Sequence, residues 1–469
     1  MKQSREKELL KKTAIITVGR VSTQFLSFLL LPLYTTLLST KEYGTVDLIT
    51  TLVQLLIPVV SLMIDQGVFR NLLNCNTYEE IARVISGAFV VLTGFVGIFV
   101  VIYVPICCLF SYSYKLWLLS ILIVTAYTNL FLQTARGLGQ TTDYALGSFV
   151  CAFVTIISNI VCIAFLHMGA VGMLIGTFLG NEICSLFLLY KLRFFRYVSF
   201  RYIDMMIVKD ELKYSLPLIP NQLSLWVMNS SDRLIVSAVL GTAANGILSV
   251  SHKFPAIYMT LFNVFQLAWH ETGASHYQDE DRNVYFSEML GKVVSFFSTL
   301  CMGIIVILPL TFEMFVNSAY KEAYYNIPIY LSASLFNVVV GFLGVVYVAT
   351  KRTAEIAKTT MIAAVINIVA NMALINFVGL FAESISTFLS YFVTMIYRII
   401  DTKRYVKIKY NIKEYILILI ALVVCSAIYY LNNKIVSLFF CPVFIGACVW
   451  ANRTMLKEIF SFIKTKMDK

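Results

Sequence analysis

The chain has 469 residues, of which 59% are hydrophobic and 13% are charged, and its formal net charge is +11. Ordinary soluble domains carry about 25% charged residues, so the composition excludes a soluble enzyme, a disordered chain and a secreted disulfide scaffold. The basic excess would suggest a nucleic-acid partner in a soluble protein, whereas a membrane protein keeps its Lys and Arg in cytoplasmic loops.

Fourteen segments are apolar enough to cross a bilayer, which takes about 20 residues in a helix. They therefore predict an all-α polytopic membrane protein with about 14 transmembrane helices. In chain order they cover approximately 14–38, 45–69, 84–109, 116–135, 147–166, 170–190, 214–240, 246–270, 289–315, 327–350, 356–378, 381–400, 414–431 and 435–451.

The positive charges predict the orientation of these helices. With the N-terminus in the cytoplasm, 30 of the 37 Lys and Arg residues lie in cytoplasmic loops or tails, four lie in outer loops and three lie within helices. This asymmetry follows the rule that cytoplasmic loops are positively charged, and it favours an even number of spans. We therefore expect both termini in the cytoplasm and no nucleic-acid partner.

The helices divide into two pseudo-repeated six-helix lobes followed by two extra helices. The motif LSTKEYG at 38–44 recurs in part as LGTAANG at 240–246, at equivalent points of the two lobes. Parallel repeats of this kind are typical of transporters, whose substrate path lies between the lobes. The predicted domains are an N-terminal lobe 1–190, a basic cytoplasmic linker 191–213, a C-terminal lobe 214–400, and helices 13 and 14 with a basic tail over 401–469.

Polar stripes run along the first two helices of each repeat, and ionisable groups at bilayer depth usually face a cavity. On the second helix the stripe comprises Asp47, Thr51, Gln54, Pro58, Ser61 and Asp65. Taken together, the four stripes predict one wet cavity. The candidate cavity residues are Arg20, Gln24, Gln54, Asn221, Gln222, Trp226, Asn229, Arg233, Lys253, Asn263 and Gln266.

Structural interpretations of the same residues stay open. Polar stripes also hold helices together, Asp232 and Arg233 are candidates for a local ion pair, and Arg20 and Lys253 are long enough to reach an interface. Asp65 is close enough in sequence to pair with Arg70. A separate row of small residues at Gly169, Gly172, Gly176 and Gly180 predicts close helix contact. No catalytic constellation, metal site or cofactor motif is found, so we expect a protein that is not an enzyme.

Three stretches resemble Wzx-type polysaccharide flippases of the multidrug/oligosaccharidyl-lipid/polysaccharide exporter superfamily. They are LKYSLPLIPNQLSLWVMNSSDR at 212–233, GILSVSHKFPAIYMTLFNVFQLAWHE at 246–271, and GRVSTQFLSFLLLPLYTTLLSTKEYGTVDL at 19–48. The resemblance implies a flippase that moves undecaprenyl-diphosphate-linked oligosaccharides across the membrane by alternating access, for capsule, O-antigen or other exopolysaccharide synthesis. It implies membrane lipids, a polysaccharide polymerase and other envelope-assembly proteins as partners.

In this interpretation the embedded cations attract the substrate diphosphate and three other groups couple transport to a proton or sodium gradient. The cations are Arg20, Lys253 and Arg233, and the coupling candidates are Asp65, Asp232 and His270. Arg20 resembles in position an essential arginine of lipid II flippases, but this chain has few equivalents of their other cavity arginines. A cation-coupled multidrug exporter, a lipid II-type flippase and a structural scaffold are the alternatives.

Overall fold

The computed structural model describes residues 28–109 and 114–451, and each regular element within those ranges is helical. The first predicted span lies mostly outside the described residues, and every later one overlaps one helix or two consecutive helices. Among the described residues, nine helices are long and apolar enough to cross a membrane. The helices of the seventh, eighth and twelfth spans are equally long but more polar. The chain is therefore a multi-pass membrane protein.

The chain divides into two compact units, Met1–Ser237 and Ala238–Lys469. This division differs from the predicted lobe boundaries, because the helix expected to open the second lobe groups here with the first unit. The two lobes stay a prediction. The helices of the first unit are α2 (Leu31–Leu37), α3 (Thr40–Val60), α4 (Ile64–Leu72), α5 (Tyr78–Leu109), α6 (Lys115–Gly137), α7 (Thr141–Asn159), α8 (Gly169–Leu192), α9 (Met205–Ser215) and α10 (Leu218–Val239).

The second predicted span is not one continuous helix, so the prediction of a single polar stripe along one helix was wrong. Pro58 has no N–H to donate to the preceding turn, and Leu62 and Met63 both have φ of 53°, which no α-helix accommodates. The chain therefore ends α3 at Val60 and begins α4 at Ile64. The break separates Ser61, which is buried, from the polar residues of α4 that follow it.

The predicted linker 191–213 is largely ordered. After α8 it forms two short 3₁₀ turns and then α9, whose N-terminus is capped by the Asp204 side chain, which accepts a hydrogen bond from the Met206 N–H at 2.9 Å. α9 packs against α4 and α5. The predicted seventh span therefore starts in α9 and is interrupted at Leu216 and Pro217 before α10 begins.

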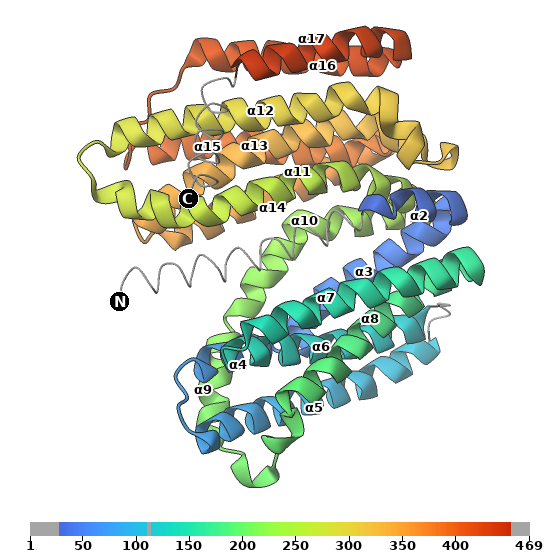
Figure 1. The fold of residues 1–469 in the computed structure, drawn as a ribbon, viewed down its shortest axis with the longest axis vertical. Helices are drawn as coiled ribbons and strands as arrows, with labels where there is room; N and C mark the ends of the chain where they lie inside the picture. Colours follow the sequence, from blue (N-terminus) through green and yellow to red (C-terminus); the bar gives the residue numbers. More distant parts are fainter. Residues whose placement is uncertain (1–27, 110–113, 452–469) are drawn as a thin grey trace, which may run out of the picture. The chain divides into compact units, whose positions relative to one another are not determined.

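The second unit is built around a buried central helix (Figure 1). α13 (Ala323–Ala349) packs against α11 (Thr242–Ser275), α12 (Arg282–Phe315) and α15 (Phe381–Thr402), and almost all its residues are buried. α14 (Thr353–Val378) packs against α15. The two extra helices, α16 (Ile412–Leu431) and α17 (Lys434–Ala451), both pack on α12, so they are attached to the outside of this unit.

The two copies of the repeated motif occupy equivalent structural positions, because each starts a long helix. Ser39 caps α3, and it forms a capping box with Glu42. Gly241 precedes α11 with φ of 92°, a backbone conformation that favours glycine. A capping serine thus begins α3, and a glycine with positive φ precedes α11.

Candidate functional site

A polar cavity of about 720 Å³ lies within the Met1–Ser237 unit. Side chains from α3, α4, α6, α9 and α10 line it, so the cavity lies beside the helix breaks at residues 61–63 and 216–217. Amide side chains are its main polar feature, and Asp65 is the one charged side chain among the described residues that line it. The amides are Gln54, Gln66, Asn129, Gln133, Asn221, Gln222 and Asn229.

The structure brings together most of the predicted cavity residues that belong to this unit. Five candidate substrate-binding residues line the cavity, and so does one coupling candidate, Asp65. Their grouping comes from three helices that are separated by up to 175 residues of sequence. The five are Gln54, Asn221, Gln222, Trp226 and Asn229.

The sequence reasoning missed the contribution of α6. Thr125, Asn129 and Gln133 are spaced four residues apart and line the cavity as one stripe. The same spacing rule that identified the stripes on other helices would have found them, but it was not applied to the predicted span 116–135. Buried Gln133 Oε1 has no hydrogen-bond partner in the described part of the chain, so the cavity offers an acceptor that a ligand hydroxyl can use.

Trp226 forms the wall between α10 and α3. Its indole is buried, and Nε1 donates a hydrogen bond to the backbone oxygen of Thr51 at 3.0 Å. Because the polar edge of the ring is satisfied by the protein, the remaining apolar ring surface is held in one orientation beside the cavity. On the other wall, the Asp65 carboxylate is also held, since Gln66 Nε2 donates to its Oδ2 at 2.6 Å.

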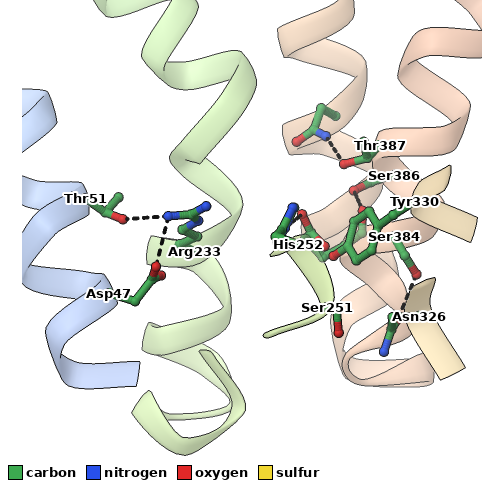
Figure 2. A network of polar contacts seen from close by, with 12 residues as sticks. Asp47, Thr51, Arg233, Ser251, His252, Asn326, Tyr330, Ser384, Ser386 and Thr387 are labelled. Carbon is green, nitrogen blue, oxygen red and sulfur yellow. Dashed lines mark hydrogen bonds and ion pairs between the residues drawn. The ribbon is translucent and has the colours of Figure 1, made fainter. Parts of the chain in front are cut away.

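Arg233 lies further along α10 and contacts α3 (Figure 2). Its Nη1 is 3.1 Å from Asp47 Oδ1 and 3.4 Å from Thr51 Oγ1. The Asp47 carboxylate, part of the predicted polar stripe, therefore forms an ion pair between two helices. The Arg233 side chain is 22% exposed, so the pair is only partly withdrawn from solvent. The adjacent coupling candidate, Asp232, is buried.

The remaining candidates have different places. Arg20 and Gln24 lie outside the described residues. Lys253, Asn263, Gln266 and His270 all lie on α11 in the second unit, where Asn263 is exposed and the other three are half-buried. A Cβ atom on Gly341 of α13 would lie 2.9 Å from Gln266 Nε2, so this amide packs closely against α13.

A second polar network lies within the Ala238–Lys469 unit, around His252 of α11, which Figure 2 labels. Its Nε2 lies 3.0 Å from Oε1 of Glu383 on α15. Glu383 was overlooked because it is an isolated acid near the start of an otherwise apolar run. An acidic residue within a predicted span was the available signal.

The chain belongs to the family described as "Polysaccharide biosynthesis protein", whose model matches residues 9–269, over half of the sequence. No curated protein sequence matches the chain significantly.

Solved structures share the fold at low sequence identity. An inward closed conformation of the lipid II flippase MurJ has 14% identity and a TM-score of 0.70, over 96% of this chain and 100% of that chain. An inward-facing multidrug resistance MATE family transporter of the MOP superfamily has 14% identity and a TM-score of 0.67, over 83% and 98%. A MOP superfamily transporter from Pyrococcus furiosus has 15% identity and a TM-score of 0.52, over 83% and 95%.

Proposed function

We propose that the protein is a flippase that moves undecaprenyl-diphosphate-linked oligosaccharide units across the bacterial cytoplasmic membrane by alternating access. The observation that carries this proposal is the cavity lined by seven amides and Trp226. Amide groups both donate and accept hydrogen bonds, so they match the hydroxyl groups of a sugar. An immobilised indole face offers an apolar surface to the C–H side of a sugar ring.

The family membership and a cation on α10 agree with this substrate class. A lipid-linked glycan suits a polysaccharide biosynthesis protein with many membrane helices, and the MurJ structure with the shared fold is that of a lipid II flippase. Arg233 is a partly buried cation that can exchange its partner Asp47 for an anionic diphosphate. Arg20 and Lys253 are the further predicted cations, and Arg20→Ala should abolish export while the protein still inserts.

In the proposed topology both termini are cytoplasmic, as the distribution of Lys and Arg predicts. The lipid-linked glycan then reaches the outer leaflet of the membrane. There a polymerase and other envelope-assembly proteins use it to make capsule, O-antigen or another surface polymer. Asp65, Asp232 and His270 remain the predicted coupling residues for a proton or sodium gradient.

A multidrug exporter is the second candidate, and Asp65 is the observation that favours it. A buried carboxylate in an otherwise neutral cavity would suit a cationic drug better than an anionic diphosphate. The two functions predict different phenotypes for a deletion strain. Loss of an exporter causes hypersensitivity to cationic drugs, whereas loss of a flippase does not.

The test measures surface polysaccharide and the lipid-linked intermediates inside the cell in a strain that lacks this gene. We expect loss of surface polymer and accumulation of the lipid-linked unit, both restored by the wild-type chain. The double substitution Gln54→Ala, Gln222→Ala should fail to restore export, whereas Gln140→Ala, an exposed amide outside the cavity, should restore it fully. Normal polymer in the deletion strain contradicts the proposal, and drug hypersensitivity with normal polymer favours the exporter.

A further inference from the structure

A basic hollow of about 490 Å³ lies at the end of α8, within the Met1–Ser237 unit, and shares no lining residue with the polar cavity. The last turn of α8 and the 3₁₀ turn Phe194–Arg196 line it. Three of the described lining residues are cations, Lys191, Arg193 and Arg196, and none is acidic. The hollow thus belongs to the start of the predicted linker, which the proposed function does not use.

The three cations are not neutralised by the described part of the protein. Their side chains are exposed, and within the described residues none of them forms a hydrogen bond, an ion pair or a cation–π contact. Asp204, an acid of the same linker, instead pairs with Arg83 of α5 at 3.6 Å. The hollow therefore presents three positive charges to an anionic ligand.

The turn that presents these cations is held firmly to its own unit. Phe194 is fully buried, and its ring packs edge-on against Phe131 of α6 with the centroids 4.7 Å apart. The backbone oxygen of Arg196 accepts a hydrogen bond from the Tyr78 hydroxyl of α5 at 2.5 Å. The backbone positions of the cations are thus set before a ligand arrives, which lowers the entropic cost of binding.

Arg193 has a backbone conformation that its own side chain disfavours. It ends α8 with φ of 47° and ψ of 43°, the left-handed region in which helix C-termini commonly place glycine. A glycine would end the helix at lower conformational cost, but it would remove one of the three charges. Residues held in such conformations cluster at functional sites, and here the strained residue is one of the cations.

The aromatic residues of the hollow indicate its position relative to the membrane. α8 is one of the helices that are long and apolar enough to span a bilayer, and the hollow lies at its end. Tyr190 is 81% exposed and Phe195 is 64% exposed. Exposed aromatic residues are enriched where a spanning helix meets the lipid head groups, and basic residues next to them attract anionic lipids. This position favours a ligand that belongs to the membrane.

We propose that Lys191, Arg193 and Arg196 bind the phosphate of an anionic phospholipid head group. The guanidinium groups bind phosphate oxygens through paired N–H donors, and the Lys191 ammonium adds a point charge. Tyr190 and Phe195 pack against the glycerol and the upper acyl chains of the same lipid. The predicted orientation places the site in the cytoplasmic leaflet, where the bound lipid anchors the start of the linker to the membrane surface. The site does not depend on the proposed transport function.

Native mass spectrometry of the purified full-length protein counts the phosphatidylglycerol molecules that it binds and measures their affinities. The test variant carries Lys191→Gln, Arg193→Asn and Arg196→Gln, with asparagine chosen because it tolerates positive φ. We expect the wild type to bind one phosphatidylglycerol molecule much more tightly than phosphatidylcholine. The test variant should bind it about a hundredfold less tightly, because each cation near an anionic lipid contributes about fivefold in affinity.

A matched control separates the hollow from the general basic charge of the linker. The control variant carries Arg201→Gln, Lys209→Gln and Lys213→Gln, three exposed cations of the same linker that do not line the hollow. It has the same net charge as the test variant and should keep the tight site. Equal losses in the two variants would show that binding follows net charge and would overturn the proposal, as would unchanged binding in the test variant.

Competition distinguishes a lipid from a soluble phosphate as the ligand. Glycerol 1-phosphate carries the same phosphate group without acyl chains, so it cannot make the apolar contacts of a lipid. We expect it to leave the tightly bound phosphatidylglycerol in place. Full displacement would assign the hollow to a soluble phosphate and would overturn the lipid assignment.

A photoactivatable phosphatidylglycerol locates the site without any substitution. In vesicles of phosphatidylcholine that contain a small fraction of this lipid, the wild type should be labelled within residues 189–196. Excess unlabelled phosphatidylglycerol should suppress this label. Labelling confined to other segments overturns the assignment, and this result stands even if the test variant does not fold.

Discussion

The indole of Trp226 donates its hydrogen bond to the backbone oxygen of Thr51, 175 residues earlier in the chain, at 3.0 Å. This bond fixes α10 against α3 and gives the cavity a rigid aromatic wall. The hydrogen bond and the aromatic surface of Trp226 can be tested separately, because a phenylalanine keeps an aromatic ring but has no N–H donor.

Trp226→Phe should retain most export and lower stability by about 1 kcal/mol, the usual net contribution of one hydrogen bond. Trp226→Ala removes the ring as well, so it should abolish export and cost about 3–5 kcal/mol. Thermal unfolding in detergent and surface polysaccharide measured in parallel check both effects. Equal loss of export in the two variants at equal expression would contradict a role for the ring surface.

The Asp47–Arg233 ion pair has two possible roles. It stabilises the packing of two helices, or it holds in position an arginine that binds the substrate. If Arg233 binds the diphosphate, Arg233→Gln should reduce export at least about tenfold, or about 1.4 kcal/mol. Asp47→Asn should keep export close to wild type, and it should change stability by no more than about 1 kcal/mol, as for other partly exposed pairs. Similar losses in both single variants, with no further loss in the double variant, would show that the pair is structural.

The buried carboxyl group of Glu211 on α9 is expected to make the stability of the folded protein depend on pH. It is fully buried beside Gly67 and Gly87, and neither carboxylate oxygen has a hydrogen-bond partner among the described residues. Burial, together with the nearby charge of Asp210, raises the pKa of Glu211 to about 9 from 4.5. The folded protein therefore binds one more proton than the unfolded chain between these pH values, so its stability falls as pH rises through that window.

We expect a slope of up to about 1.4 kcal/mol per pH unit from this one group. Glu211→Gln should flatten the slope measured by thermal unfolding at pH 6, 7, 8 and 9, whereas the exposed Glu322→Gln should not. A wild-type stability that does not decline over this range would show that Glu211 is ionised in the folded protein.

The small-residue face of α8 was predicted to permit close helix contact, and the structure confirms it. A Cβ atom on Gly180 would lie 2.8 Å from the backbone oxygen of Cys151, and one on Gly176 would lie 3.2 Å from the backbone nitrogen of Asn159. Gly180→Ala should therefore destabilise the protein by about 1–3 kcal/mol.

A matched change at Gly97 should have the opposite sign. A Cβ there meets no described atom within 4 Å, so Gly97→Ala should stabilise α5 by about 0.5–1 kcal/mol. Unfolding temperatures of the two variants in the same detergent check the pair of predictions. Similar shifts for both would mean that α7 and α8 can separate without cost.

Part of the site could be predicted from the chain alone. The stripe that contains Gln222, Trp226 and Asn229 lies on one helix, and the spacing of 3.6 residues per turn determines which side chains share a face. That rule needs no knowledge of neighbours. It also applied to Asn129 and Gln133, which only a fuller reading of the same pattern would have identified.

The pairings could not be predicted in this way. Arg233 meets Asp47, and His252 meets Glu383, across 186 and 131 residues of sequence. No periodic pattern relates one helix to the rotation of another. Likewise, the break after Pro58 depends on Leu62 and Met63 adopting positive φ, which the sequence did not signal because both residues ordinarily favour a continuous helix.

The sequence by itself determined that this is an all-helical, multi-pass membrane protein, because hydrocarbon thickness acts on each segment locally. Only the tertiary structure decided which polar faces meet. Polar contacts between helices depend on helix rotation, breaks and close approach, and these arise when many side chains pack at once.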